Sequence, residues 1–133
     1  MFVYKQIGVC SMSAMPDAIA TDRPVSTPYR LLVVNGNTTS DLTVSLAAQA
    51  RAFFGGAADV HAVTAAFGPA YIASRVEAAV AAHAVLETVE REAARAEAPF
   101  DACLLACFGE PGIGAVRECL TAVSYTHLRA HET

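Results

Sequence analysis

The sequence of 133 residues has no tryptophan and no cluster of basic side chains: nine Lys and Arg face thirteen Asp and Glu, for a formal net charge of -4. Proteins that bind nucleic acid neutralise phosphates with grouped lysines and arginines, so this composition argues against a nucleic-acid partner. No uninterrupted apolar run is long enough to cross a bilayer, which argues against a membrane partner. We therefore expect a cytoplasmic protein.

The four cysteines, Cys10, Cys103, Cys107 and Cys119, lack the spacing of a disulfide framework. In the cytoplasm such thiols stay reduced. Apart from two histidines in the C-terminal tail, the chain shows no metal-ligand spacing, and no Gly-x-Gly-x-x-Gly follows its first expected strand, so we expect neither a metal nor a nucleotide cofactor.

The first 28 residues are loosely patterned, with three prolines and scattered serine and threonine. We expect this leader to be disordered, or to precede a later start such as Met12 or Met15. The folded part is therefore expected to begin at Tyr29.

Residues 123–133, VSYTHLRAHET, do not continue the apolar pattern before them. They match one reading frame of a transposase adapter used in shotgun sequencing, so we interpret them as a non-native tail and exclude them from fold reasoning. His127 and His131 have the spacing of a helical metal pair, but that interpretation is discarded with the tail. Residues 29–122 then form one incomplete α/β domain.

Apolar runs of strand length alternate with helical patterns through this domain. The expected strands are 29–35, 59–63 and 100–107, and the expected helices are 41–53, 70–97 and 113–120. This alternation predicts a parallel, three-layer α/β sheet of the flavodoxin-like kind. In the long helix, the expected inner stripe consists of Ile72, Val76, Val80 and Leu86, with His83 at its border and a solvated, ion-paired face over residues 87–97.

Cys107 ends the third expected strand and opens a turn rich in glycine and proline. In open parallel sheets, ligands bind outside the carboxyl ends of the strands, where loops lead into helices. The positive end of the following helix would favour the thiolate and make Cys107 reactive. The alternative is a buried cysteine that serves only packing.

Three motifs in order resemble the hydantoin racemase branch of the aspartate/glutamate racemase superfamily, over about residues 31–120. Asn35-Gly36-Asn37-Thr38-Thr39 resembles a family loop in which proline usually occupies the Gly36 position, and Gly68-Pro69-Ala70-Tyr71-Ile72-Ala73-Ser74 resembles a helix entry. Cys107-Phe108-Gly109-Glu110-Pro111-Gly112 resembles the turn around the first catalytic cysteine, with Glu110 replacing the usual aspartate.

The resemblance implies a cofactor-independent racemase that moves a proton at a carbon next to a carbonyl, in a hydantoin, allantoin or related amino acid. Two cysteines on opposite faces of the substrate would do this, and Cys107 would be the first. The resemblance also implies that the second cysteine belongs to a later, pseudo-symmetric domain. These 133 residues alone are then expected to be inactive and poorly soluble, and the full-length protein is expected to be a homo-oligomer.

The remaining site residues follow from the same resemblance. Asn37, Thr38 and Thr39 would orient the substrate, and the backbone N–H groups of Phe108 and Gly109 would stabilise the developing enolate oxygen. For other residues two interpretations stay open. Tyr71 either packs or contacts substrate, His61 is either a solvated strand end or a pocket residue, and Arg117 and Glu118 either pack their helix or brace the turn.

Neither of the neighbouring cysteines fits the role of the second thiol. Cys103 lies roughly 13 Å back along the strand, and Cys119 roughly 10 Å up the helix. We expect both to be packing residues. A second function class also remains open: a non-enzymatic α/β domain that binds a small anion or a flavin phosphate through the hydroxyl-rich loop of residues 37–40.

Overall fold

The computed structural model describes residues 27–98, 100–107 and 109–119, with only the backbone described at Cys119. Its elements follow in the order β1 (Tyr29–Asn35), α1 (Ser40–Phe54), the 3-10 turn η3 (Gly55–Ala57), β2 (Ala58–Thr64), α2 (Arg75–Arg95), β3 (Ala102–Leu105) and α3 (Ile113–Cys119). The predicted leader, the adapter-like tail and Phe108 lie outside the described residues. Among the described residues, no helix is long and apolar enough to span a membrane.

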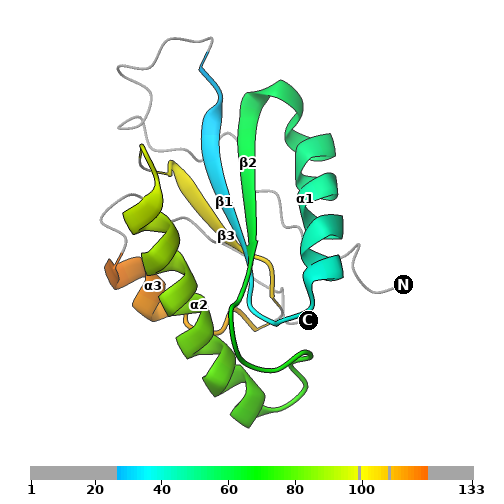
Figure 1. The fold of residues 1–133 in the computed structure, drawn as a ribbon, viewed down its shortest axis with the longest axis vertical. Helices are drawn as coiled ribbons and strands as arrows, with labels where there is room; N and C mark the ends of the chain where they lie inside the picture. Colours follow the sequence, from blue (N-terminus) through cyan, green and yellow to red (C-terminus); the bar gives the residue numbers. More distant parts are fainter. Residues whose placement is uncertain (1–26, 99, 108, 120–133) are drawn as a thin grey trace, which may run out of the picture. The chain divides into compact units, whose positions relative to one another are not determined.

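The strands form a parallel sheet in the order β2-β1-β3 (Figure 1). Leu32 of β1 pairs with His61 of β2 and with Cys103 of β3. After β2 the chain therefore crosses back over β1 to reach its other side, as parallel connections require. The predicted three-layer α/β architecture is confirmed.

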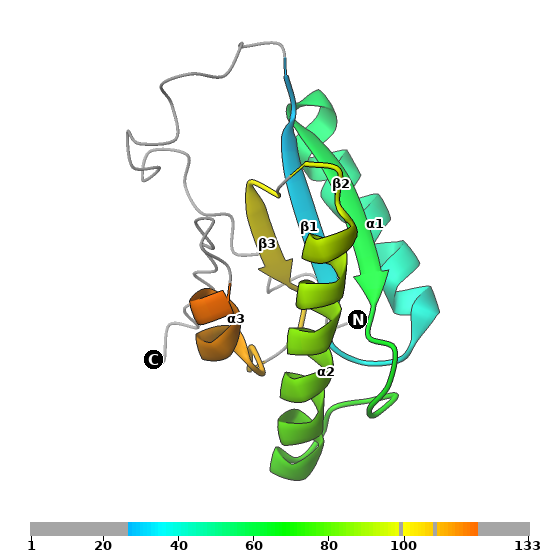
Figure 2. The same cartoon turned by 60° about the vertical axis from the view of Figure 1, so that its left-hand side comes forward.

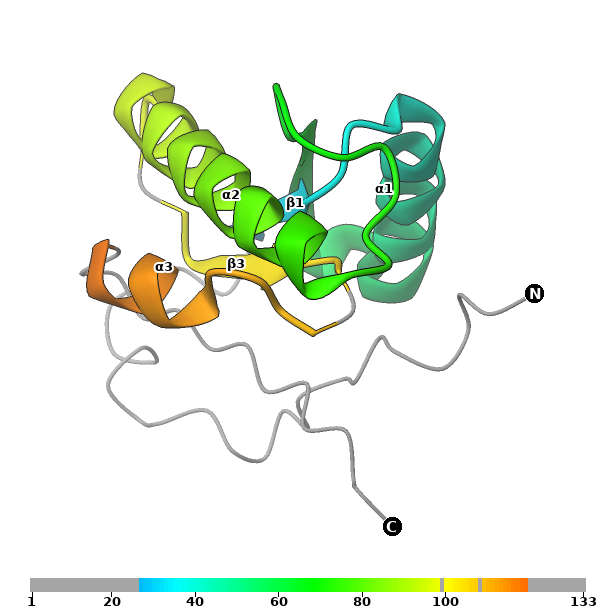
Figure 3. The ribbon, with the colours of Figure 1, turned by 90° about the horizontal axis from the view of Figure 1, so that it is seen from below.

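The central strand β1 supplies both halves of the core because its side chains alternate between the two faces. Leu31 and Val33 pack with Ala50 and Val60 on the face covered by α1. Leu32 and Val34 pack on the opposite face, which α2 and α3 cover (Figures 1 and 3). The other members of that second cluster are Val85, Val89, Cys103, Leu105 and Val116. Such two-sided burial explains why the strand sequence is continuously apolar.

Helix α2 begins five residues later than predicted, at Arg75 rather than Ala70. Its amino end is a capping box: the Ser74 hydroxyl accepts from the Glu77 N–H at 3.2 Å, and the Glu77 carboxylate accepts from the Ala73 N–H at 2.7 Å. The predicted inner stripe is wrong at Val76 and Val80, which are exposed, and is confirmed only at Leu86, which is partly buried against the core. The helix instead buries Ala81, Ala84, Val85, Thr88 and Val89.

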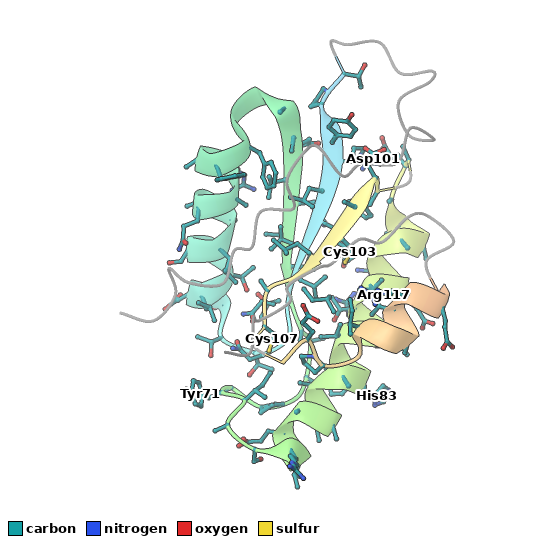
Figure 4. The ribbon with its side chains drawn as sticks, turned by 180° about the vertical axis from the view of Figure 1, so that it is seen from behind. Tyr71, His83, Asp101, Cys103, Cys107 and Arg117 are labelled. Atoms are coloured by element: carbon teal, nitrogen blue, oxygen red, sulfur yellow. The ribbon has the colours of Figure 1, made fainter. Side chains whose placement is uncertain are left out.

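Strand β3 is shorter than predicted and ends at Leu105, so Cys107 follows the strand instead of ending it. Its start is fixed by Asp101, whose carboxylate accepts from the Arg30 N–H at 2.6 Å and whose own N–H donates to the Arg30 carbonyl at 2.8 Å. These bonds hold β3 against β1 at the amino end of the sheet. Figure 4 shows Asp101 at one end of β3 and Cys107 beyond the other.

Candidate active site

The connections after β1 and β3 leave the sheet toward opposite faces, because α1 covers one face and α3 the other (Figure 3). This divergence makes the carboxyl ends of β1 and β3 a topological switch point, the usual ligand position in open α/β sheets. The Ala106 N–H donates to the Val34 carbonyl at 2.9 Å and extends the pairing to this edge. The residues that follow, Gly36 and Cys107, then meet each other directly.

Gly36 is buried against the Cys107 side chain. A Cβ atom placed on Gly36 would lie 3.8 Å from Cys107 Sγ, 3.6 Å from Cys107 Cβ and 3.1 Å from Val85 Cγ2. A side chain at position 36 would therefore occupy the space beside the thiol. The first and third motifs, 72 positions apart from Asn35 to Cys107, build one site.

Cys107 itself is half-buried, and burial raises the pKa of its thiol above the usual value. The predicted shift toward thiolate is thus wrong in direction. Helix α3 begins only at Ile113, after a turn of several residues, while the effect of a helix end fades within its first turn. Desolvation of the charged form is then the dominant influence on this thiol.

The turn after Cys107 is tight, and three of its residues have positive backbone φ angles. The Glu110 N–H donates to the Cys107 carbonyl at 3.3 Å, and the Ile113 N–H donates to the Glu110 carbonyl at 3.1 Å. Backbone φ is positive at Gly109 (78°), Glu110 (45°) and Gly112 (83°). A Cβ on Gly112 would lie 2.9 Å from the Ala82 carbonyl oxygen, so the turn rests against the backbone of α2 where only glycine fits.

The loop after β1 is organised by a buried amide that the sequence analysis did not single out as functional. Asn35 Nδ2 lies within 3.0–3.1 Å of the Asn37 side-chain oxygen, the Thr39 carbonyl and the Thr43 hydroxyl. Asn35 Oδ1 accepts from the Asn37 N–H at 3.2 Å, and the Thr43 hydroxyl contacts that of Thr64 at 2.6 Å. A polar residue directly after the buried apolar run of residues 31–34 was the available signal for this role.

The second motif lies beside this loop. The Thr38 N–H donates to the Pro69 carbonyl at 3.1 Å, and the Thr39 hydroxyl donates to the Ala70 carbonyl at 2.8 Å. These two bonds join the first two motifs of the sequence. Tyr71 follows them but is 74% exposed and points away from the protein in Figure 4.

The hydrogen-bonding groups of residues 37–39 divide into used and unused sets. The N–H groups of Asn37, Thr38 and Thr39 all donate within the protein. Asn37 Oδ1 accepts from Asn35 Nδ2 and from the Thr39 N–H. Within the described part of the chain, no hydrogen bond engages Asn37 Nδ2 or the Thr38 hydroxyl. Those two groups remain for a ligand.

Cys103 is separated from this site, as predicted. It is buried on the α2 face of the sheet, and burial raises the pKa of its thiol to about 12. Figure 4 places it in β3, between Asp101 and Cys107. A thiol that stays protonated inside the core serves packing. The side chain of Cys119 lies outside the described residues.

The two described histidines lie outside the candidate site. His61 is in the middle of β2, opposite Leu32, and not at a strand end as predicted. Its Nε2 lies 3.0 Å from the Glu92 carboxylate, and its ring stacks on Phe100. His83 is exposed on α2 and packs edge-to-face on Phe67 (Figure 4). Among the described residues, no group of three His, Cys, Asp or Glu side chains could hold a metal ion.

Comparison with known proteins defines the class to which this fold and site correspond. The family model described as Asp/Glu/Hydantoin racemase matches residues 31–128, so the chain belongs to this racemase family. The matched region contains the Cys107 turn and the whole three-stranded sheet except Tyr29 and Arg30 at the start of β1.

Relatives with known names give a finer comparison. The chain is 40% identical over 89 residues to a hydantoin racemase of Paenarthrobacter aurescens, covering 67% of this chain and 37% of that protein. It is 33% identical to the structure of an allantoin racemase from Klebsiella pneumoniae, with a TM-score of 0.62 over 68% of this chain and 36% of that one. It is 35% identical to the allantoin racemase of Pseudomonas fluorescens, with a TM-score of 0.64. That match covers 71% of this chain and 39% of the Pseudomonas chain. The chain thus spans less than two fifths of the length of these relatives.

Proposed function

We propose that Cys107 is one of two catalytic thiols of a racemase that acts on a five-membered cyclic ureide, a hydantoin or allantoin. The observation that carries the proposal is the position of Cys107 at the switch point, half-buried beside Gly36. Similarity to a hydantoin racemase and to two allantoin racemases supports the ureide as substrate.

The reaction needs one base and one acid on opposite faces of a ring carbon next to a carbonyl. A thiolate takes the proton from one face, and the electron pair of the broken C–H bond moves onto the carbonyl oxygen. A thiol on the other face then gives its proton to the carbon, which inverts the centre. The two sulfurs end the turnover with exchanged protonation states, so no external oxidant or reductant is required.

The burial of Cys107 indicates whether it begins the reaction as the acid or as the base. Since burial raises the pKa of the Cys107 thiol, this group rests protonated near neutral pH and suits the proton donor. The second cysteine, which we place in a further domain of the whole protein, then starts as the base. By this proposal the 133-residue chain alone is inactive, because a single thiol at the site cannot act on both faces.

The neighbouring groups suit the recognition of a ureide ring. Asn37 Nδ2 and the Thr38 hydroxyl are oriented by bonds that their residues make within the loop, and both can donate to ring carbonyl oxygens. The N–H of Gly109 in the turn, with that of Phe108, would stabilise the enolate oxygen. Tyr71, exposed at the same end of the sheet, would contact substrate only after movement or from a second copy.

The test uses the complete reading frame that contains this chain. Loss of optical rotation of a 5-substituted hydantoin and of allantoin, with deuterium uptake at the ring carbon, is measured for the native protein and for Cys107→Ser. We expect the variant to lose racemisation, while Cys103→Ser retains it. Equal rates for native protein and Cys107→Ser would exclude Cys107 as a catalytic thiol.

The alternative of a small-anion or flavin-phosphate binder is not favoured. Such sites cradle phosphate with unused backbone N–H groups at a loop or helix start. Here the N–H groups of Asn37, Thr38 and Thr39 are all engaged within the protein. The loop is built to present side chains instead.

We also infer self-association of the whole protein and its residence in the cytoplasm. Four large apolar side chains are exposed on the loop before α2 and on its first turns, namely Phe67, Tyr71, Val76 and Val80. Clustered exposed apolar groups often mark contact surfaces and lower solubility. Light scattering of the complete protein, which we expect to show more than one copy per particle, tests the first inference.

A further inference from the structure

Glu110 combines two unusual features at one residue. Its backbone φ is 45°, the one positive φ of a non-glycine residue among those described. Its Oε1 atom is buried and accepts no hydrogen bond from any residue that the structure describes. Strained backbone and unsatisfied buried polar atoms are each unfavourable, and both concentrate at functional sites.

The turn holds this residue close to Cys107. The Glu110 N–H donates to the Cys107 carbonyl, so the two residues are the ends of one tight turn. Gly112 then fixes the far side of the turn against the Ala82 carbonyl of α2. The Oε1 atom of Glu110 is therefore a buried acceptor without a donor among the described residues, in a residue held within one turn of the candidate thiol.

We infer that Glu110 accepts a hydrogen bond from a ring N–H of the substrate and makes the site selective for ureides that carry this N–H. The inference rests on the proposed function, which places a cyclic ureide beside Cys107. A ureide ring presents N–H donors next to its carbonyls, and a carboxylate is a stronger acceptor for them than a neutral group. The donors described above, Asn37 Nδ2 and the Thr38 hydroxyl, serve the ring carbonyls and leave its N–H groups to an acceptor.

The experiment uses the complete protein that contains this chain and measures how ligands protect Cys107 from alkylation by iodoacetamide, with peptide mass spectrometry to report on Cys107 alone. The probes are 5-methylhydantoin and its two ring-N-methylated derivatives, 1,5- and 3,5-dimethylhydantoin. We expect 5-methylhydantoin to protect Cys107 about tenfold better than one of the derivatives, as a hydrogen bond to a charged group would give. The weaker derivative identifies the ring nitrogen that faces Glu110.

Two variants separate recognition from backbone strain. Glu110→Gly removes the carboxylate and relieves the positive φ, whereas Glu110→Gln keeps the strain and a neutral acceptor. In Glu110→Gly we expect all three ligands to protect Cys107 equally. In Glu110→Gln we expect 5-methylhydantoin to keep a smaller advantage over the N-methylated derivative. Glu118→Gln, an exposed carboxylate change on α3, is the matched control and should keep the wild-type difference.

The outcomes distinguish this inference from the function on which it rests. If Glu110→Gly keeps the tenfold preference and changes only the melting temperature, Glu110 is a structural turn residue and the inference fails alone. If all three ligands protect wild-type Cys107 equally, the N–H contact does not exist while the ureide site stands. If no hydantoin protects wild-type Cys107, both the substrate class and the inference are overturned.

Discussion

Gly36 and Cys107 lie side by side at the carboxyl edge of the sheet, where a Cβ on Gly36 would come within 3.8 Å of the Cys107 sulfur. The two residues belong to β1 and β3 connections that leave toward opposite faces. Their contact joins the loop that presents Asn37 to the turn that presents the thiol. Because position 36 is glycine, the space beside the Cys107 sulfur stays open.

Replacing Gly36 by alanine should crowd the site. The added methyl group would lie 3.1 Å from Val85 Cγ2, which is closer than ordinary contact. We expect Gly36→Ala to lower the free energy of unfolding by about 2 kcal/mol and to slow alkylation of Cys107 by covering the sulfur. Urea denaturation and the alkylation rate measure the two effects.

The control for that variant is Gly56→Ala, since a Cβ on Gly56 meets nothing within 4 Å. Its unfolding free energy should stay within about 0.5 kcal/mol of wild type. Adding Val85→Ala to Gly36→Ala removes the crowding atom, so the pair should be less destabilised than the sum of the single changes. Strict additivity would show that Val85 and position 36 do not interact.

Replacing the donor amide of Asn35 by a carboxylate should disrupt the loop after β1. Asn35 is 1% exposed, and its Nδ2 donates toward three acceptors. Asn35→Asp keeps the shape but puts a carboxylate oxygen against those acceptors, so we expect a loss of about 3 kcal/mol in unfolding free energy. Gln49→Glu, the same chemical change on the outer part of α1, should alter stability by less than about 0.5 kcal/mol. Comparable losses in both variants would contradict the assigned network.

Two glycines of the Cys107 turn allow the cost of backbone strain to be measured separately from the cost of a steric clash with α2. Both have positive φ, 78° at Gly109 and 83° at Gly112, but only the Gly112 Cβ position is blocked, by the Ala82 carbonyl at 2.9 Å. Gly109→Ala should lose about 1 kcal/mol from backbone strain alone, and Gly112→Ala at least about 2 kcal/mol more. Thermal unfolding of the two variants side by side checks this. If both variants lost the same amount of stability, the turn would not pack against α2 at Gly112.

Cys103 should make the fold less stable at alkaline pH. Burial raises the pKa of this thiol to about 12, so above the ordinary thiol pKa the unfolded chain releases its proton while the folded chain retains it. The contribution is complete below that ordinary value and declines by about 1.4 kcal/mol per pH unit as the pH rises toward 12. Cys103→Ala should flatten this part of the profile, which chemical denaturation between pH 8 and 11 measures. An unchanged slope would assign the alkaline loss to other groups.

The alternation of strands and helices could be predicted because both faces of a parallel sheet are buried, which leaves apolar runs separated by glycine and proline. The position of Cys107 at the carboxyl edge followed from the same pattern. The start of α2 could not be predicted from residues 70–74, whose sequence also suits a helix. Hydrogen bonds from Thr38 and Thr39 to the carbonyls of Pro69 and Ala70 hold the chain there in a loop, and these are tertiary contacts.

The position of Cys107 just beyond the third strand was predictable, and its surroundings were less so. The thiol pKa was predicted in the wrong direction because the burial of Cys107 could not be seen in the sequence, although the start of α3 at Ile113 was expected. Asn35 and Gly36 were read as parts of a motif, but their contacts with Thr43, Val85 and Cys107 arise only when the strands are aligned. Whether Asn37, Thr38, Gly109 and Tyr71 meet substrate stays a prediction.

Helix α2 contacts both segments around the thiol although it contributes no reactive group. Val85 bears on Gly36, and the backbone of Ala82, one helical turn away, bears on Gly112. A shift or rotation of this helix would displace the loop after β1 and the turn after β3 together, and so change the surroundings of the Cys107 sulfur. Replacement of the small residues of α2 is therefore expected to reshape the space around the thiol without altering any residue of the three motifs.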